Sequence, residues 1–284
     1  LLVLRYEGLD EVTREARIQF SPEPLEITAS QATFDIELDP KGETAVVVMV
    51  ACDVGDSHRP LLAYDAAMAE AGLAFGAEQT EDCTIQTSNA QFNEWWNRSV
   101  LDVRMMVTDT NEGPYPYAGV PWFSTPFGRD GVITALECLW IRPELARGVL
   151  AYLASTQAKE VNPGQDAEPG KILHETRKGE MAALNEIPFG LYYGSVDSTP
   201  LFVMLAGAYY ERTADLAFIQ SIWANLEAAL TWMDTFGDPD RDGFVEYVRK
   251  SPTGLDNQGW KDSHDSISHE DGSLAEGPIA LCEV

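Results

Sequence analysis

The sequence predicts a mainly α-helical chain that is preceded by a β-sandwich segment. Residues 1–55 alternate apolar and polar positions, which is the period of half-exposed strands. From Ser88 onward the apolar residues recur every three or four positions, which is the period of helices packed by one face. No run of 18 apolar residues occurs, so the helices are those of a globular domain. We therefore expect part of an N-terminal β-sandwich domain over 1–55, a linker over 56–87 and a helical domain over 88–284.

The predicted strands lie between turns near the N-terminus. Alternation marks residues 16–21 (ARIQFS), 24–28 (PLEIT) and 32–38 (ATFDIEL) as half-buried strands. The turn DPKG follows, with proline at its second position. Residues 43–52 (ETAVVVMVAC) are continuously apolar and predict a strand that is buried on both faces. The opening stretch LLVLRYEG has the composition of a strand, and we expect that the sequence begins within this strand.

The predicted helices follow from apolar periodicity and from their first residues. The sequence indicates a serine cap at Ser88, a cap at Asp130, and a proline in the first turn of two later helices. A Gly- and Pro-rich stretch over 161–197 is too long for an ordinary connection and indicates a functional loop. The expected helices cover residues 88–107, 129–140, 142–160, 198–213 and 215–236, and one more begins at 275.

The net charge bears on the partners of the chain, and the cysteine content bears on its compartment. The formal net charge is −27, from 46 acidic and 19 basic residues. A field of that sign repels phosphate, so we expect neither nucleic acid nor an anionic membrane surface as a partner. The four cysteines form no CxxC pair, which is typical of a protein of the reducing cytoplasm. Cys138 lies among apolar residues and is expected in the core.

Two loops combine aromatic rings with charged groups, as sugar-binding walls do. In VPWFSTPFGRDG (120–131) the rings are Trp122, Phe123 and Phe127, of which Trp122 and Phe127 are the candidates for contact with a sugar. The pair Arg129–Asp130 follows at a helix start, where Asp130 can instead be the N-cap. The second loop lies within 170–197 and also joins rings to carboxylates, although its last acidic residue can merely cap the next helix. Its candidates are Glu175, Arg177, Tyr193 and Asp197.

An acidic turn follows the helix over 215–236. Asp238, Asp240 and Asp242 alternate ahead of a glycine, and Glu246 follows, which resembles the start of a calcium loop. The twelfth position of that loop would need a bidentate glutamate but holds an arginine. The turn is therefore either a weak structural Ca²⁺ site or an ordinary acidic connection.

The stretch NQGWKDSHDSISHEDG (257–272) holds the candidate acid. Glycoside hydrolysis needs one carboxyl that protonates the leaving oxygen and a second that acts as base or nucleophile. Trp260 would partly shield an adjacent carboxyl from water, so Asp262 is the candidate general acid and Asp265 is the runner-up. Trp260 and Lys261 are candidates for contact with the sugar. No further ligand pattern supports the two histidines as a zinc pair.

Six motifs occur in an order that resembles one family. Together they resemble the bacterial amylo-α-1,6-glucosidase, or glycogen-debranching, proteins, well over 88–284 and loosely over 1–55: STPFGRDGVIT, ILHETRKGE, YYGSVDSTPLFV, DGFVEY, GWKDSHDS and GPIALCEV. The resemblance implies an (α/α)6 toroid, of which this chain would supply about half of the helices. It also implies an inverting, exo-acting α-glucosidase that acts on α-glucan without a required cofactor.

The same resemblance implies roles for single residues. Asp262 follows a Gly-Trp pair and would protonate the glycosidic oxygen, while Arg129 and Asp130 would hold the non-reducing-end sugar. Tyr193 and Asp197 would belong to the same pocket. The general base of the family is a glutamate of the later half, which this sequence lacks. Glu283 would be a packed helix residue instead.

The resemblance thus describes a chain truncated at both ends. We expect it to need the remainder of its own polypeptide and to hydrolyse little alone. Three other functions stay open on the sequence: a related toroid glycosidase acting on a trehalose-like or mannosyl substrate, a non-catalytic carbohydrate-binding protein, and a calcium-stabilised helical domain.

Overall fold

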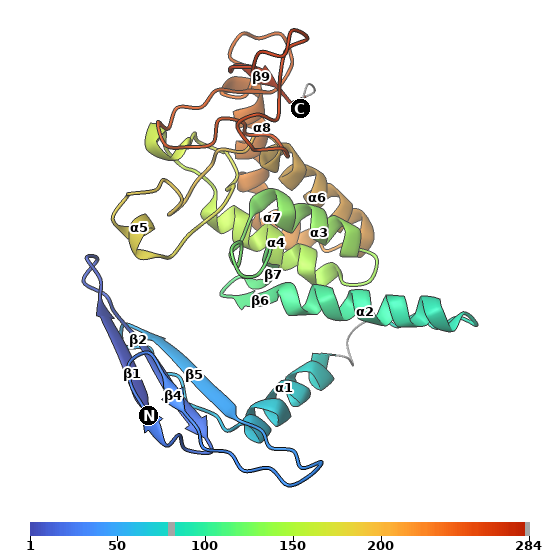
Figure 1. The fold of residues 1–284 in the computed structure, drawn as a ribbon. Helices are drawn as coiled ribbons and strands as arrows, with labels where there is room; N and C mark the ends of the chain where they lie inside the picture. Colours follow the sequence, from blue (N-terminus) through green and yellow to red (C-terminus); the bar gives the residue numbers. More distant parts are fainter. Residues whose placement is uncertain (79–82, 282–284) are drawn as a thin grey trace. The chain divides into compact units, whose positions relative to one another are not determined.

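The chain consists of two compact units. The computed structural model describes residues 1–78 and 83–281, with side chains described over 1–73 and 83–281. The first unit is Leu1–Asp82 and the second is Cys83–Val284 (Figure 1). Cys282 and Glu283, for which the sequence gives expectations, lie outside the described residues. Compact units need not coincide with domains, so the predicted domain boundaries stay a prediction.

The first unit is built on a small antiparallel sheet. Its strands β1 (Leu2–Glu7), β2 (Thr13–Ser21) and β5 (Val47–Val54) lie in the order β1-β2-β5. A separate two-stranded ladder joins β3 (Glu26–Ile27) to β4 (Ala32–Thr33), and helix α1 (Tyr64–Glu78) follows. The turn between β1 and β2 is held by Arg14, whose Nη2 lies 2.6 Å from Asp10 Oδ2.

The prediction that the last strand of this unit is buried on both faces is wrong. Strand β5 lies at an edge of the sheet, and its residues alternate between the two faces. Ala51 and Asp53 are buried, whereas Val48 and Val50 are more than half exposed. A continuous apolar run therefore hid the alternation, because β-branched residues occupy both faces here.

The second unit packs helices around one core. Its helices are α2 (Ala90–Met106), α3 (Gly128–Cys138), α4 (Pro143–Thr156), α5 (Glu180–Ala183), α6 (Ser198–Thr213), α7 (Leu216–Ser221) and α8 (Trp223–Thr235), with a 3-10 turn η1 at Pro163–Gln165. Helices α3, α4, α6 and α8 gather into one bundle in Figure 1. Short ladders join β6 (Val107–Thr110) to β7 (Gly113–Pro116) and β8 (Glu246–Tyr247) to β9 (Ile279–Ala280).

The core of this unit forms where one face of α4 meets α6. Leu150 and Leu153 of α4 are fully buried, as are Phe202 and Leu205 of α6. Gly148 lets β7 lie directly on α4, because a Cβ there would stand 2.2 Å from the carbonyl oxygen of Pro114. These contacts hold the β6–β7 hairpin, and with it the loop that follows, against the helices.

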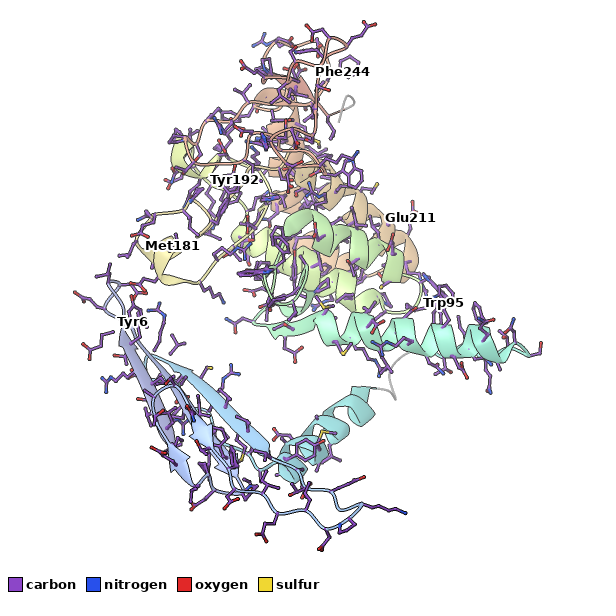
Figure 2. The ribbon with its side chains drawn as sticks, viewed as in Figure 1. Tyr6, Trp95, Met181, Tyr192, Glu211 and Phe244 are labelled. Carbon is purple, nitrogen blue, oxygen red and sulfur yellow. The ribbon has the colours of Figure 1, made fainter. Side chains whose placement is uncertain are left out.

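Helix α2 departs from the expected packing. Its predicted N-terminus is confirmed to within a residue, with Asn89 rather than Ser88 as the cap that accepts from the Phe92 amide. Its apolar face is only half-buried, and Trp95, which is labelled on α2 in Figure 2, is well exposed. Tyr192, labelled in the same figure, is fully buried among the loops.

Three local predictions also need correction. The helix expected over 215–236 breaks at Ile222 into α7 and α8. Asp130 does not cap α3, whose N-cap position is Phe127, and it lies in the first helical turn instead. The helix expected from residue 275 does not form over the described residues 275–281, where the structure has the two-residue strand β9 instead. Gly277 and Pro278, just before it, are poor helix formers, which explains the last of these.

The predicted mainly α class, with a partial (α/α)6 toroid, is wrong for this chain. Only 35% of the residues are helical and 18% lie in strands, spread over several small antiparallel sheets. Apolar periodicity overlooks such ladders, since strands of two to four residues show no period. The described helices include none that is long and apolar enough to span a bilayer.

Candidate active site

An open cavity of about 600 Å³ lies at the N-terminal end of α3. It is lined from the loop after β7, from α3 and from the loop over 257–262: Pro116, Tyr117, Ala118, Phe123, Phe127, Arg129, Asp130, Ile133, Thr134, Trp260 and Asp262. Five of the residues that the sequence singled out are therefore brought together here, from segments more than 100 positions apart. They are Phe127, Arg129, Asp130, Trp260 and Asp262.

Arg129 lies at the centre of three carboxylates. Its Nη1 donates to the carbonyl oxygen of Gly259 at 2.7 Å and to Oδ2 of Asp197 at 3.3 Å. Its Nη2 lies 3.5 Å from Oδ2 of Asp262, and its Nε lies 3.7 Å from Oδ1 of Asp130. The Arg129 side chain is only 10% exposed, so each of its nitrogens faces a protein oxygen in a poorly solvated place.

The start of α3 is fixed by a close approach to the neighbouring loop. The Gly128 amide donates to the His174 carbonyl at 2.8 Å, and Phe127 and Glu175 form an isolated β-bridge. A Cβ on Gly128 would stand 1.9 Å from the carbonyl oxygen of Leu173. Only glycine therefore allows this approach, which places the next two residues at the cavity.

The two cavity carboxyls, Asp130 and Asp262, both lie beside Arg129. Burial raises the pKa of Asp130; the nearby Arg129 charge opposes this, while the charges of Asp262 and Asp197 add to it. Asp130 and Asp262 are equally open to solvent, with 41% of each side chain exposed. Asp130 thus holds a proton more readily than an ordinary aspartate, and a molecule in the cavity can reach either carboxyl.

The loop that carries Asp262 has a buried stem and an exposed end. Asn257, Gln258 and Gly259 are buried, whereas Trp260 is 62% exposed. The Gln258 carbonyl accepts from the Val196 amide at 2.8 Å. The Asn257 side chain donates to the Ser263 carbonyl at 2.6 Å, which closes the loop around Asp262. Next to it, Lys261 Nζ lies 5.5 Å from the centre of the Trp260 ring.

Glu175 and Arg177 lie beside the cavity without lining it. Arg177 Nε donates to Oε2 of Glu175 at 2.6 Å, and its Nη1 donates to the Trp122 carbonyl at 2.6 Å. The Arg177 guanidinium also faces the Phe127 ring at 5.7 Å. Burial raises the pKa of Glu175; Arg177 opposes this, and the Asp262 charge adds to it. The Trp122 ring itself is 80% exposed.

Three other predicted residues lie away from the cavity. Tyr193 belongs to the hydrophobic core, and its hydroxyl donates to the Thr156 carbonyl at 2.6 Å. Asp197 is buried, does not line the cavity and accepts a hydrogen bond from Arg129. Asp265 is exposed and does not line the cavity.

Some lining residues carried a signal that the sequence reasoning did not use. Ile133 and Thr134 lie one helical turn after Arg129 and Asp130, so the i, i+4 spacing of α3 places each pair on one face. Tyr117 gave no such signal, because it follows a strand of only four residues.

The acidic turn groups three of its four predicted ligands. Oxygens of Asp238, Asp240 and Asp242 lie within 4.8 Å of one another, in a group that does not include Glu246. The same carboxylates accept backbone amides, such as that of Gly243 at 3.1 Å from Asp238 Oδ2. These three residues are the ones that could hold a cation such as Ca²⁺.

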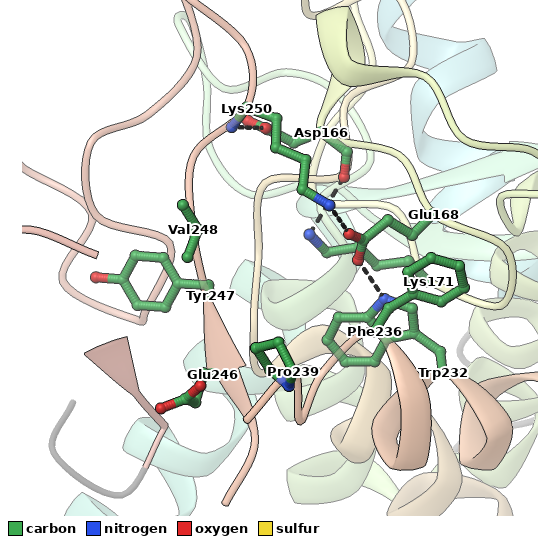
Figure 3. A pocket seen from close by; sticks show the side chains of 10 residues that line it. All are labelled: Asp166, Glu168, Lys171, Trp232, Phe236, Pro239, Glu246, Tyr247, Val248 and Lys250. Carbon is green, nitrogen blue, oxygen red and sulfur yellow. Dashed lines mark hydrogen bonds and ion pairs between the residues drawn. The ribbon is translucent and has the colours of Figure 1, made fainter. Parts of the chain in front are cut away.

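A second, smaller cavity of about 100 Å³ is lined by the loop over 166–171, by the end of α8 and by the segment around β8 (Figure 3). Lys171 is buried there, which lowers its pKa to about 8, against the opposing charges of Glu168 and Asp166. Trp232 Nε1 donates to Glu168 at 2.7 Å, and Lys250 forms an ion pair with the same carboxylate. Asp166 accepts the Lys250 and Ser251 amides at 2.5 and 2.9 Å, so this network fixes the chain that leads to the Asp262 loop.

Comparison with known proteins reaches only the first unit. Residues 1–49 match the family model of the N-terminal domain of (some) glycogen debranching enzymes. The chain thus begins with a domain like the N-terminal domain of a glycogen debranching enzyme. No curated protein matches the chain. The matched residues lie outside the unit that contains the cavity.

Proposed function

We propose that this chain belongs to a glycoside hydrolase of the glycogen-debranching type, an inverting, exo-acting α-glucosidase of the amylo-1,6-glucosidase kind. The observation that carries the proposal is the cavity in which the Asp262 carboxyl lies with Trp260, Phe127 and the Arg129–Asp130 pair. Apolar rings suit the faces of a sugar, and the charged groups suit its hydroxyls. The match of residues 1–49 to a debranching-enzyme domain supports the same activity.

In the proposed reaction Asp262 is the general acid. It would give its proton to the glycosidic oxygen while a second carboxyl activates water on the other side of the sugar. We propose that this base comes from the remainder of its own polypeptide, so that the chain alone is inactive. The proposed substrate is a cytoplasmic α-glucan, and no cofactor takes part in either step.

The test is Asp262→Asn in the full-length polypeptide that carries this chain. We expect kcat on an α-1,6-branched limit dextrin to fall by a factor of about 100 to 10,000, because an asparagine cannot protonate a poor leaving group. Release of glucose in the β configuration, followed by NMR, would establish inversion. Near-normal kcat in the variant would contradict the assignment of Asp262.

Asp265→Asn is the matched control, since it makes the same change three residues away on an exposed part of the loop. Its kcat should be unchanged. Asp130→Asn tests the other carboxyl of the cavity. If that variant alone is inactive, Asp130 is the general acid. Trehalose and mannosyl-glycerate test the related substrates, and sugar binding without any hydrolysis would indicate a carbohydrate-binding protein.

A further inference from the structure

We propose that Ser195, Asp197 and Arg129 form a positioning relay that holds the Asp262 loop in place. The proposal deepens the function above and rests on it, because it takes Asp262 as the acid. It gives Asp197 a different role from the direct sugar contact that the sequence suggested. The relay runs behind the cavity, from the segment before α6 to the start of α3 and on to the stem of the loop.

The first link joins Ser195 to Asp197. The Ser195 hydroxyl lies 2.6 Å from Oδ1 of Asp197 and 2.7 Å from the Ser198 hydroxyl. An ionised carboxylate only accepts, so Ser195 donates its single proton to Asp197 and Ser198 donates to Ser195. Ser195 and Ser198 are fully buried. This link fixes one oxygen of Asp197 and thereby the orientation of its carboxylate.

The second link joins Asp197 to the loop through Arg129. The other oxygen of Asp197 accepts from Arg129 Nη1, which also donates to the carbonyl of Gly259 at 2.7 Å. Both oxygens of Asp197 are therefore engaged within the protein, and Asp197 does not line the cavity. Its carboxylate is placed to orient a guanidinium rather than a sugar hydroxyl.

The third link explains why the loop needs this arrangement. Arg129 holds the loop stem with Nη1 and faces the Asp262 carboxyl with Nη2, 3.5 Å away. Because the guanidinium is planar and rigid, fixing Nη1 also fixes Nη2. Beyond Gly259 the chain becomes exposed at Trp260, so the packing of the loop end alone does not set the position of Asp262.

Ser195→Ala tests the relay without touching a cavity residue. In the full-length polypeptide we expect kcat to fall on the order of tenfold, the usual effect of losing one hydrogen bond to a charged group. KM should change less than about twofold, because the sugar-contacting groups remain. Ser251→Ala is the matched control: Ser251 is also a buried serine, and its hydroxyl has no hydrogen-bond partner among the described residues.

Asp197→Asn supplies a double-mutant cycle. If both residues act through Arg129, the double variant should be no slower than Asp197→Asn alone, since the serine then has nothing left to orient. Multiplicative losses of kcat would overturn the relay, because they would mean two independent structural effects.

Hydrogen exchange of the chain itself separates the relay from the proposed function. Backbone amides of residues 257–262 should exchange about tenfold faster in Ser195→Ala than in the wild type, and at wild-type rate in Ser251→Ala. Faster exchange supports the relay even if no substrate is ever hydrolysed. Unchanged exchange together with unchanged kcat overturns the relay while leaving the hydrolase intact.

Discussion

Acidification should destabilise the second unit through His174. This side chain is 2% exposed and lies edge-on to the rings of Phe127 and Tyr192, at 5.4 and 5.8 Å between centroids. Its Nδ1 has no hydrogen-bond partner within the described parts of the chain. Burial lowers its pKa from 6.5 to about 3, and the positive charges of Arg129, Lys171 and Arg177 add to the effect. The native unit therefore contains neutral imidazole.

The size of the effect follows from proton uptake on unfolding. Between pH 6.5 and about 3 this histidine is protonated in the unfolded chain but stays neutral in the native state. The neutral ring therefore makes its full contribution to the free energy of unfolding above pH 6.5. Below pH 6.5 this contribution falls by about 1.4 kcal/mol for each pH unit. At pH 5 the loss is about 2 kcal/mol, a large part of the stability of an ordinary domain.

Urea unfolding of wild type and His174→Gln at pH 7 and pH 5 measures this. All seven tryptophans lie between Trp95 and Trp260, so their fluorescence reports only on the second unit. The free energy of unfolding of the variant relative to wild type should rise by about 2 kcal/mol on going from pH 7 to 5. The raised pKa values of Asp130 and Glu175 act in the opposite sense but cancel in this difference.

His264→Gln is the control, since His264 lies exposed on its loop. It should follow the pH dependence of the wild type. If His174→Gln does so too, the reasoning from burial is refuted.

Two further predictions concern other buried and acidic groups. Because the pKa of Lys171 is lowered from 10.5 to about 8, only the unfolded chain binds its proton between these values, and stability rises with pH there. Relative to Lys171→Met, the wild type should gain about 2.5 kcal/mol between pH 7 and 10 in urea titrations, and parallel curves would contradict this. If Asp238, Asp240 and Asp242 bind Ca²⁺, millimolar CaCl₂ should raise the Tm of the wild type by several degrees but not that of Asp240→Asn; melting that is insensitive to chelator would count against the site.

Long periodic elements were predictable from the sequence, and short ones were not. Helix α6 has the predicted bounds, because its apolar period and the proline in its first turn act over 16 residues. The two-residue strands β8 and β9 pair across more than 30 positions of the sequence, and no local sequence pattern predicts such a pairing. Their formation depends on tertiary contacts of Tyr247 and Ile279, which are both buried.

The kinds of residue at the candidate site were predictable, but the direction of each side chain was not. Arg129 and Asp262 could be chosen from chemistry and spacing, and they do meet at one cavity. Tyr193 has the same chemistry as a sugar-facing residue, yet it points into the core. Ser195, a small residue in a loop, gave no signal, since its importance depends on where the Asp197 carboxylate lies.

The loop that carries Asp262 has a buried stem, where the sequence is constrained, and an exposed tip, where sequence and length can change. The stem at 257–259 is tied to the rest of the unit, while residues 268–272 form an exposed turn closed by the His269 amide on the Ser273 carbonyl at 2.8 Å. Insertions and exchanges at this tip cost little in folding. The length of this turn can accordingly change while the stem keeps the Asp262 carboxyl in place.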